Sequence, residues 1–161
     1  AIAEEKGEQP EKIPECLVDI QIDAHIPESY ISSLNQRIDM YRKIMLVNED
    51  SDKTDLIDEL IDRYGDPPKS VLGLVEVSLL RNKAAHLGIT EISQKNGAMY
   101  FYTEYLCPEQ IAALSQAYKG KITFNGMGKS YVSVKISPKM KPFDMMKETV
   151  ELIYQNRQAT A

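Results

Sequence analysis

The chain has 161 residues, 43% of them hydrophobic and 27% charged, which is the size of one ordinary domain with enough apolar content for a core. It holds no apolar run of about 18 residues, and its first ten residues are acidic, so we expect neither a transmembrane helix nor a signal peptide. Two cysteines cannot build a disulfide framework or a four-ligand zinc site, which favours a reducing, cytoplasmic setting. A net charge of −5 argues against nucleic-acid binding by the chain as a whole.

The N-terminal segment, residues 1–15, has the composition of a flexible acidic linker, with five acids, two prolines and almost no apolar pattern. We expect the folded domain to cover residues 16–157 and residues 158–161 to form a disordered tail. From Val18 to Ala24 apolar and polar residues alternate, which predicts a half-buried strand over residues 17–24 that ends before Pro27.

Three helices are predicted next. The first, over about residues 28–47, has one apolar face spaced by three and four residues, made of Ile31, Leu34, Ile38, Tyr41 and Met45. The second has Ser51 or Asp52 as its N-cap and ends at Gly65. The third begins at Asp66-Pro67-Pro68 and is apolar on most sides, so we expect it to be the most buried helix. Gly73 inside it is expected to admit a second backbone at close range.

The second half of the chain reads as one unit used twice. Residues 89–94 and 98–103 flank Asn96-Gly97, the strongest short signal for a hairpin, and a helix with Ile111, Leu114 and Tyr118 inward follows from Pro108 to Gly120. Strands over 121–124 and 131–136 then precede a last helix, with Phe143, Met146, Val150 and Ile153 on one face. This order predicts an α+β fold: an N-terminal strand and three helices, then two ββα units, with an antiparallel sheet and helices mainly on one face.

Residues 126–130 end in Gly-Lys-Ser, like a phosphate-binding loop. The complete motif also needs a glycine at position 123, where the chain has Thr123, and a helix after the loop, where a strand is predicted. A hairpin turn is therefore the better interpretation.

No other residue pattern predicts catalysis or metal binding. His25 and His86 have no cysteine or carboxylate at ligand spacing, and Cys107 has no basic neighbour in the sequence to activate it, so it is interpreted as a packing residue. The only loose candidates for acid–base chemistry are three carboxylates near the end of the first strand: Asp19, Asp23 and Glu28. We therefore predict no catalytic, cofactor-binding or metal-binding residue in this domain.

Charge is unevenly distributed along the chain. Residues 48–66 contain eight acids and two bases, and Glu59 and Asp62 lie three residues apart, which places them on one helix face within reach of guanidinium groups. Residues 119–147 contain seven lysines and one acid, and the candidate phosphate contacts among the lysines are Lys121, Lys129, Lys139 and Lys141. The ordinary interpretation of such runs is a solvated surface. Two alternatives are an acidic helix that docks on arginines and an accessory nucleic-acid-binding module.

Two segments resemble the C-terminal domain of the bacterial transcription-repair coupling factor family. IQIDAHIPESYI at residues 20–31, followed by Arg37 and Tyr41, resembles the start of that domain. ELIDRYGDPP at residues 59–68 resembles its Glu-x-x-Asp-Arg-aromatic-Gly-x-x-Pro signature, with Tyr64 where Phe is common. The resemblance extends in order over about residues 17–155 and is loose after residue 103.

This resemblance implies that the chain is a regulatory domain of a larger, ATP-driven translocase of double-stranded DNA. Such a parent displaces stalled RNA polymerase and recruits excision repair through UvrA. The C-terminal domain is expected to dock within the parent on a UvrB-like module, mask the UvrA-binding surface and restrain activity. Carried over, the docking residues are Glu59 and Asp62. ATP and Mg²⁺ would belong to motor domains, because this chain has no nucleotide-binding motif, and the isolated domain is expected to be monomeric.

Overall fold

The computed structural model describes residues 15–157, so the predicted tail at 158–161 and all of the predicted linker except Glu15 lie outside the described residues. The elements, in chain order, are β1 (Leu17–Asp19), α1 (Leu34–Met45), α2 (Asp50–Tyr64), α3 (Lys69–His86), β2 (Ile89–Lys95), β3 (Ala98–Thr103), α4 (Pro108–Ala117), β4 (Ile122–Asn125), β5 (Tyr131–Lys135) and α5 (Pro142–Gln155). The α+β class and the predicted order of elements are confirmed. None of the helices described is long and apolar enough to cross a membrane.

The sheet has five strands in the order β1-β2-β3-β5-β4 and is mixed, not purely antiparallel as predicted. Four strands form antiparallel pairs, but β1 pairs parallel to β2, with Val18 opposite Ile92. The reason is the connection: between β1 and β2 the chain passes through three helices, a crossover long enough to return it in the same direction.

The first strand is shorter than predicted. It ends at Asp19, and the apolar residues that follow it do not pair in the sheet. Instead the chain crosses α3, where His25 N donates to Ser70 O at 3.2 Å. A Cβ built on Gly73 would lie 3.2 Å from the backbone oxygen of Asp23, which confirms the predicted close approach at this glycine.

The two ββα units follow the prediction closely. The turn between β2 and β3 has positive φ at Asn96 (54°) and Gly97 (74°), the geometry that matches the twist of a two-residue hairpin. Leu114 on α4 and Tyr118, the C-cap of that helix, are buried as predicted, whereas Ile111 is 39% exposed, contrary to prediction. Ile111 lies in the first turn of α4, outside the cluster of side chains that covers the sheet.

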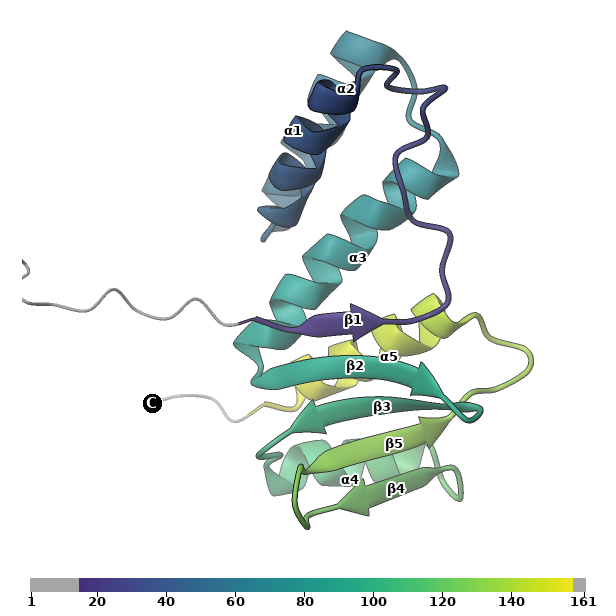
Figure 1. Ribbon diagram of the computed structural model, residues 1–161. Helices are drawn as coiled ribbons and strands as arrows, with labels where there is room; N and C mark the ends of the chain where they lie inside the picture. The colour runs from purple at the N-terminus through teal and green to yellow at the C-terminus, as the bar shows by residue number, and fades with distance from the viewer. Residues whose placement is uncertain (1–14, 158–161) are drawn as a thin grey trace, which may run out of the picture.

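Two separate hydrophobic clusters hold the molecule together, and α3 takes part in both. The sheet core lies between the strands and the helices α4 and α5, and it includes Leu80 and Ala84 from the second half of α3. The helical core lies among α1, α2 and the first half of α3, with Val71 and Val75 from that helix. Figure 1 shows α3 running from the α1–α2 pair to the sheet, while α4 and α5 lie behind the strands.

The predicted apolar face of α1 is right only in part. Ile31 is buried and Tyr41 packs against the helical core, whereas Leu34, Ile38 and Met45 are exposed; the buried residues of the helix itself are Met40 and Ile44. The helix begins at Leu34, not near residue 28, because Ser33 is the N-cap and its side chain accepts from Gln36 N. α1 carries apolar residues on more than one side, so two different stripes fit the 3.6-residue period of a helix. Packing against α3 buries the stripe that contains Met40 and Ile44.

The starts of α2 and α3 also differ from the predicted positions. The N-cap of α2 is Glu49, because Asp52 occupies the third helical position and accepts from Glu49 N at 3.1 Å as half of a capping box. The N-cap of α3 is Pro68 instead of Asp66. Gly65 ends α2 with φ of 85°, as predicted.

Candidate functional site

The last turns of α2 present the two carboxylates that sequence reasoning singled out. Glu59 and Asp62 lie on the outer side of the helix, whereas Leu56 and Leu60 enter the helical core. The Glu59 side chain is 34% exposed, and Asp62 is exposed. Both carboxylates are therefore reachable from outside the domain.

The two carboxylates differ in how they are held. Lys43 Nζ of α1 donates to Glu59 Oε2 at 2.6 Å, and Arg63 donates to the same oxygen at 3.0 Å. These bonds, the one from Lys43 first, hold the pKa of Glu59 below its usual value. Asp62 makes no ion pair within residues 15–157. Among these residues, both bonds to Glu59 use Oε2, so Lys43 and Arg63 hold this carboxylate in place, whereas no cation holds Asp62.

The rest of the family signature builds the end of α2. Tyr30 Oη donates to Gly65 O at 2.7 Å, and the rings of Tyr30 and Tyr64 lie 5.8 Å apart. The Arg63 guanidinium lies 5.0 Å from the centre of the Tyr64 ring. These contacts fix the direction of the last helical turn and therefore of the two carboxylates.

Arg37 and Tyr41, which extend the first family-like segment, also act within the domain. Arg37 donates to Ile31 O at 2.8 Å, and the hydroxyl of Tyr41 accepts from Ile26 N at 2.9 Å. Both residues tie α1 to the segment that enters it. They support the position of α1, and through Lys43 the position of Glu59.

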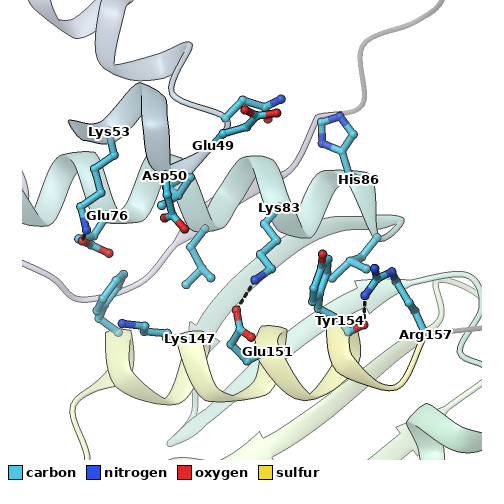
Figure 2. Close-up of a pocket in the computed structure, with 15 residues that line it drawn as sticks. Glu49, Asp50, Lys53, Glu76, Lys83, His86, Lys147, Glu151, Tyr154 and Arg157 are labelled. Atoms are coloured by element: carbon cyan, nitrogen blue, oxygen red, sulfur yellow. Dashed lines mark hydrogen bonds and ion pairs between the residues drawn. The ribbon is translucent and has the colours of Figure 1, made fainter. Parts of the chain in front are cut away.

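A cleft of about 670 Å³ lies between α2, α3 and α5. Figure 2 shows that charged side chains from the three helices point into it. Lys53 of α2 pairs with Glu76 of α3, and Lys83 of α3 pairs with Glu151 of α5. Apart from the phenol of Tyr154, the lining residues supply no hydroxyl or thiol nucleophile. The first ion pair holds α2 on α3 within the helical part, and the second ties α3 to α5 of the sheet part, so both have a structural task.

The remaining candidates from the sequence lie apart from one another. His25 contacts Asp23, and His86 Nδ1 lies 2.8 Å from Asn82 O on its own helix. Cys107 is buried as the N-cap of α4, which confirms its interpretation as a packing residue. Residues 126–130 form the turn between β4 and β5, as interpreted. Within residues 15–157 there is no group of three or more potential metal ligands.

The four candidate phosphate contacts do not form one patch. Lys121 lies at the start of β4, next to the end of β5, since Lys135 N donates to Lys121 O. Lys139 and Lys141 belong to the loop before α5. Lys129 lies in the β4–β5 turn, at the opposite end of this hairpin, where its Nζ pairs with Glu91 Oε1 at 2.9 Å. Proximity in sequence therefore overstated how far these lysines act together.

Sequence reasoning missed a cluster of tyrosines on the sheet. Tyr100 and Tyr102 of β3 and Tyr131 of β5 lie with ring centres 5.1 to 6.3 Å apart. The signal available was the alternation of Tyr100 and Tyr102 within a predicted strand. It was not decisive, because Met99 and Phe101 make the other face of β3 equally apolar.

Comparisons with known proteins point to one family. A family profile described as TRCF domain matches residues 20–126. The transcription-repair-coupling factor of Staphylococcus aureus (strain USA300) is 33% identical over 113 residues, which cover 69% of this chain and 10% of that protein. That of Staphylococcus haemolyticus is 34% identical over 97 residues, 59% of this chain and 8% of that protein. The chain thus spans about a tenth of the length of these relatives.

A solved structure is similar over nearly the whole fold. The crystal structure of the C-terminal domain of a transcription-repair coupling factor superposes with a TM-score of 0.75 at 21% identity, covering 89% of this chain and 94% of that one. At this identity the likeness speaks to the fold, including the C-terminal ββα unit that lies mostly beyond the family match.

Proposed function

Because the chain belongs to the TRCF family, that of the C-terminal domain of transcription-repair coupling factors, we propose that it is a regulatory domain without catalytic activity of its own. In this proposal it docks on the UvrB-like module of its parent protein through Glu59 and Asp62. Docking covers the surface that UvrA would bind and restrains the parent until the domain is released.

One observation carries this proposal: two acids of the family signature, a half-buried Glu59 and an exposed Asp62, lie on one helix face, and the rest of the signature holds that face in place. A carboxylate pair three residues apart can accept guanidinium donors from an opposing surface, since arginine offers planar paired donors. Within residues 15–157, Oε1 of Glu59 and both carboxylate oxygens of Asp62 have no hydrogen-bond partner, so they could accept such a donor.

A latch of this kind has to be releasable. Truncating one partner of a buried, hydrogen-bonded charge pair costs about 2–5 kcal/mol. Every 1.4 kcal/mol shifts a closed–open equilibrium about tenfold, so losing these two acids would be enough to open the parent.

In the same proposal, the parent protein is an ATP-driven translocase of double-stranded DNA that displaces stalled RNA polymerase in the cytoplasm and recruits excision repair through UvrA. ATP and Mg²⁺ are held by its motor domains. This domain supplies no step of ATP hydrolysis and acts only by covering another surface.

The test is a double substitution, Glu59→Gln with Asp62→Asn, in the full-length parent. These changes remove two charges and keep the side-chain shapes. UvrA binding, measured by surface plasmon resonance, and basal ATPase activity should both rise by at least fivefold.

The matched control also removes two charges, by the substitutions Glu109→Gln and Asp144→Asn. Glu109 is exposed on α4, and Asp144 is exposed on α5. It should leave UvrA binding and ATPase activity within twofold of the unmodified parent. If neither readout rises in the Glu59/Asp62 variant while circular dichroism shows that the protein is still folded at the assay temperature, these residues do not hold the latch.

A further inference from the structure

The side of the sheet that α4 and α5 do not cover carries an aromatic surface. Register places Tyr102 opposite Tyr131 and Tyr100 opposite Ser133, so these side chains share one face of the sheet. Their neighbours on the strands, Phe101 and Val132, point to the other face and belong to the sheet core. Figure 1 shows both C-terminal helices behind the strands, which leaves the opposite side open.

Lysines surround these rings. Lys129 Nζ lies 4.4 Å from the centre of the Tyr102 ring, and Lys95 Nζ lies 4.8 Å from that of Tyr100. Lys95 also donates to the hydroxyl of Tyr102 at 2.8 Å, and this bond, above all, raises the pKa of its ammonium group. Lys135 is exposed and pairs with Ala98, which places it on the same face. We call the surface formed by Tyr100, Tyr102, Tyr131, Lys95, Lys129 and Lys135 the tyrosine face.

The tyrosine face is locally basic although the chain carries a net charge of −5. The acids of residues 48–66 belong mainly to α2, which Figure 1 places at the end of the molecule away from the β4–β5 hairpin. Two acids share the tyrosine face or its margin: Asp19, opposite Ser93 in the register, and Glu91, which accepts from Lys129 and from Ser93. The tyrosine face and its margin therefore carry three lysines and two acids.

We infer that the tyrosine face binds single-stranded nucleic acid, with bases stacked on the half-buried rings of Tyr100 and Tyr131 and phosphates held by Lys95, Lys129 and Lys135. Proteins that bind single strands combine aromatic platforms with a positively charged track in this way. Tyr102 is 8% exposed and supports the two outer rings instead of stacking itself.

The chemistry favours a nucleic acid over an acidic peptide. Lys95 lies over the rings of Tyr100 and Tyr102, and Lys129 lies over that of Tyr102, so these rings accept a flat or cationic group on their faces. A base would replace the ammonium of Lys95 over the Tyr100 ring, and the displaced lysine would then meet the phosphate attached to that base. A peptide carboxylate would satisfy the lysines but leave the rings without a stacking partner.

Glu91 gives the inference a gain-of-function test. Its carboxylate holds Lys129 at 2.9 Å, so it competes with a phosphate for that cation. Glu91→Gln should release Lys129 and tighten binding of a fluorescein-labelled 15-mer of thymidine by about three- to tenfold at 50 mM salt, measured by fluorescence anisotropy on the 161-residue chain.

Loss of the rings and of the lysines should weaken binding in different ways. Tyr100→Leu with Tyr131→Leu keeps apolar packing and removes stacking, which should cost about 5- to 150-fold in affinity for each base lost. Lys129→Ala should lower the slope of log affinity against log salt by about 0.7, the value for one phosphate contact on a single strand.

The control is Lys139→Ala with Lys141→Ala, which removes two exposed lysines outside the tyrosine face and should change affinity less than twofold. A duplex of the same length should bind at least tenfold more weakly, because its bases cannot stack on the rings. The inference is overturned if the 15-mer does not bind at 50 μM protein, if Glu91→Gln leaves affinity unchanged, or if the control weakens binding as much as the tyrosine substitutions.

Discussion

The two hydrophobic cores differ in size and in how they are closed. Within residues 15–157, the sheet core contains 16 buried residues between a hydrogen-bonded sheet and the helices α4, α5 and the second half of α3, whereas the helical core contains nine, among three helices. Strands joined across a sheet share a network of backbone hydrogen bonds, but α1 and α2 depend on side-chain packing against α3. The helical part should therefore open at lower free energy than the sheet part.

This difference in stability suits the acidic pair and the tyrosine face to different tasks. The acidic pair belongs to α2, in the smaller core, where a regulatory contact benefits from a part that can shift. The tyrosine face belongs to the sheet, where register fixes the rings relative to each other. α3 joins the two parts, and the ion pair between Lys83 of α3 and Glu151 of α5 in the cleft strengthens the connection (Figure 2).

The largest effect should come from cavities in each core. Phe101→Ala in the sheet core should cost about 3–5 kcal/mol, and Leu60→Ala in the helical core about 2–5 kcal/mol, because both side chains are fully buried. Hydrogen exchange should then separate the parts. Leu60→Ala should remove protection mainly from α1 and α2, while Phe101→Ala should lower it throughout. Equal loss of protection in both parts by Leu60→Ala would show that the two cores unfold as one.

Local signals explain why the sheet half was predicted well. Asn96-Gly97 fixes a two-residue turn, and alternation around it sets the strands, so β2 and β3 match within one residue. For α1 the local signal was ambiguous. Leu34 and Met45 fit a helical stripe as well as Met40 and Ile44 do, and only the position of α3 decides between them. The parallel pairing of β1 depends in the same way on a contact between residues more than 70 positions apart.

In the candidate surfaces, too, features set by local spacing were predictable, and features set by contacts between distant elements were not. The spacing of Glu59 and Asp62 was enough to place them on one exposed helix face. That Lys43 holds Glu59 was not predictable, because the contact joins two helices. The tyrosine face depends on the register between β3 and β5, which brings Tyr131 beside Tyr102 across 29 residues of sequence. Proximity in sequence pointed to Lys121, Lys129, Lys139 and Lys141, and of these only Lys129 belongs to that face.

A smaller effect is expected where the two parts are joined. Gly73→Val should destabilise the domain by about 1–3 kcal/mol, because even a Cβ there would lie 3.2 Å from the backbone oxygen of Asp23. Helix propensity alone predicts the opposite sign, since valine is a better helix former than glycine. Urea unfolding measures the difference. Gly126→Val is the control, because nothing lies within 4 Å of its Cβ position; a cost as large as at Gly73 would mean that the close approach is not the cause.

The smallest effect distinguishes the fixed carboxylate from the free one. The folded pKa of Glu59 is lowered by Lys43 and Arg63, so its stabilisation is present above the unfolded pKa of about 4.3 and is lost as pH falls through the folded value. Glu59→Gln should thus cost about 0.2–1 kcal/mol in urea unfolding at pH 7, as for partly exposed pairs, and progressively less at and below about pH 4. Asp62→Asn should cost less at either pH, because Asp62 makes no ion pair within residues 15–157. If the two substitutions cost the same at pH 7, then Lys43 and Arg63 do not stabilise Glu59, and both acids are equally free to meet a partner.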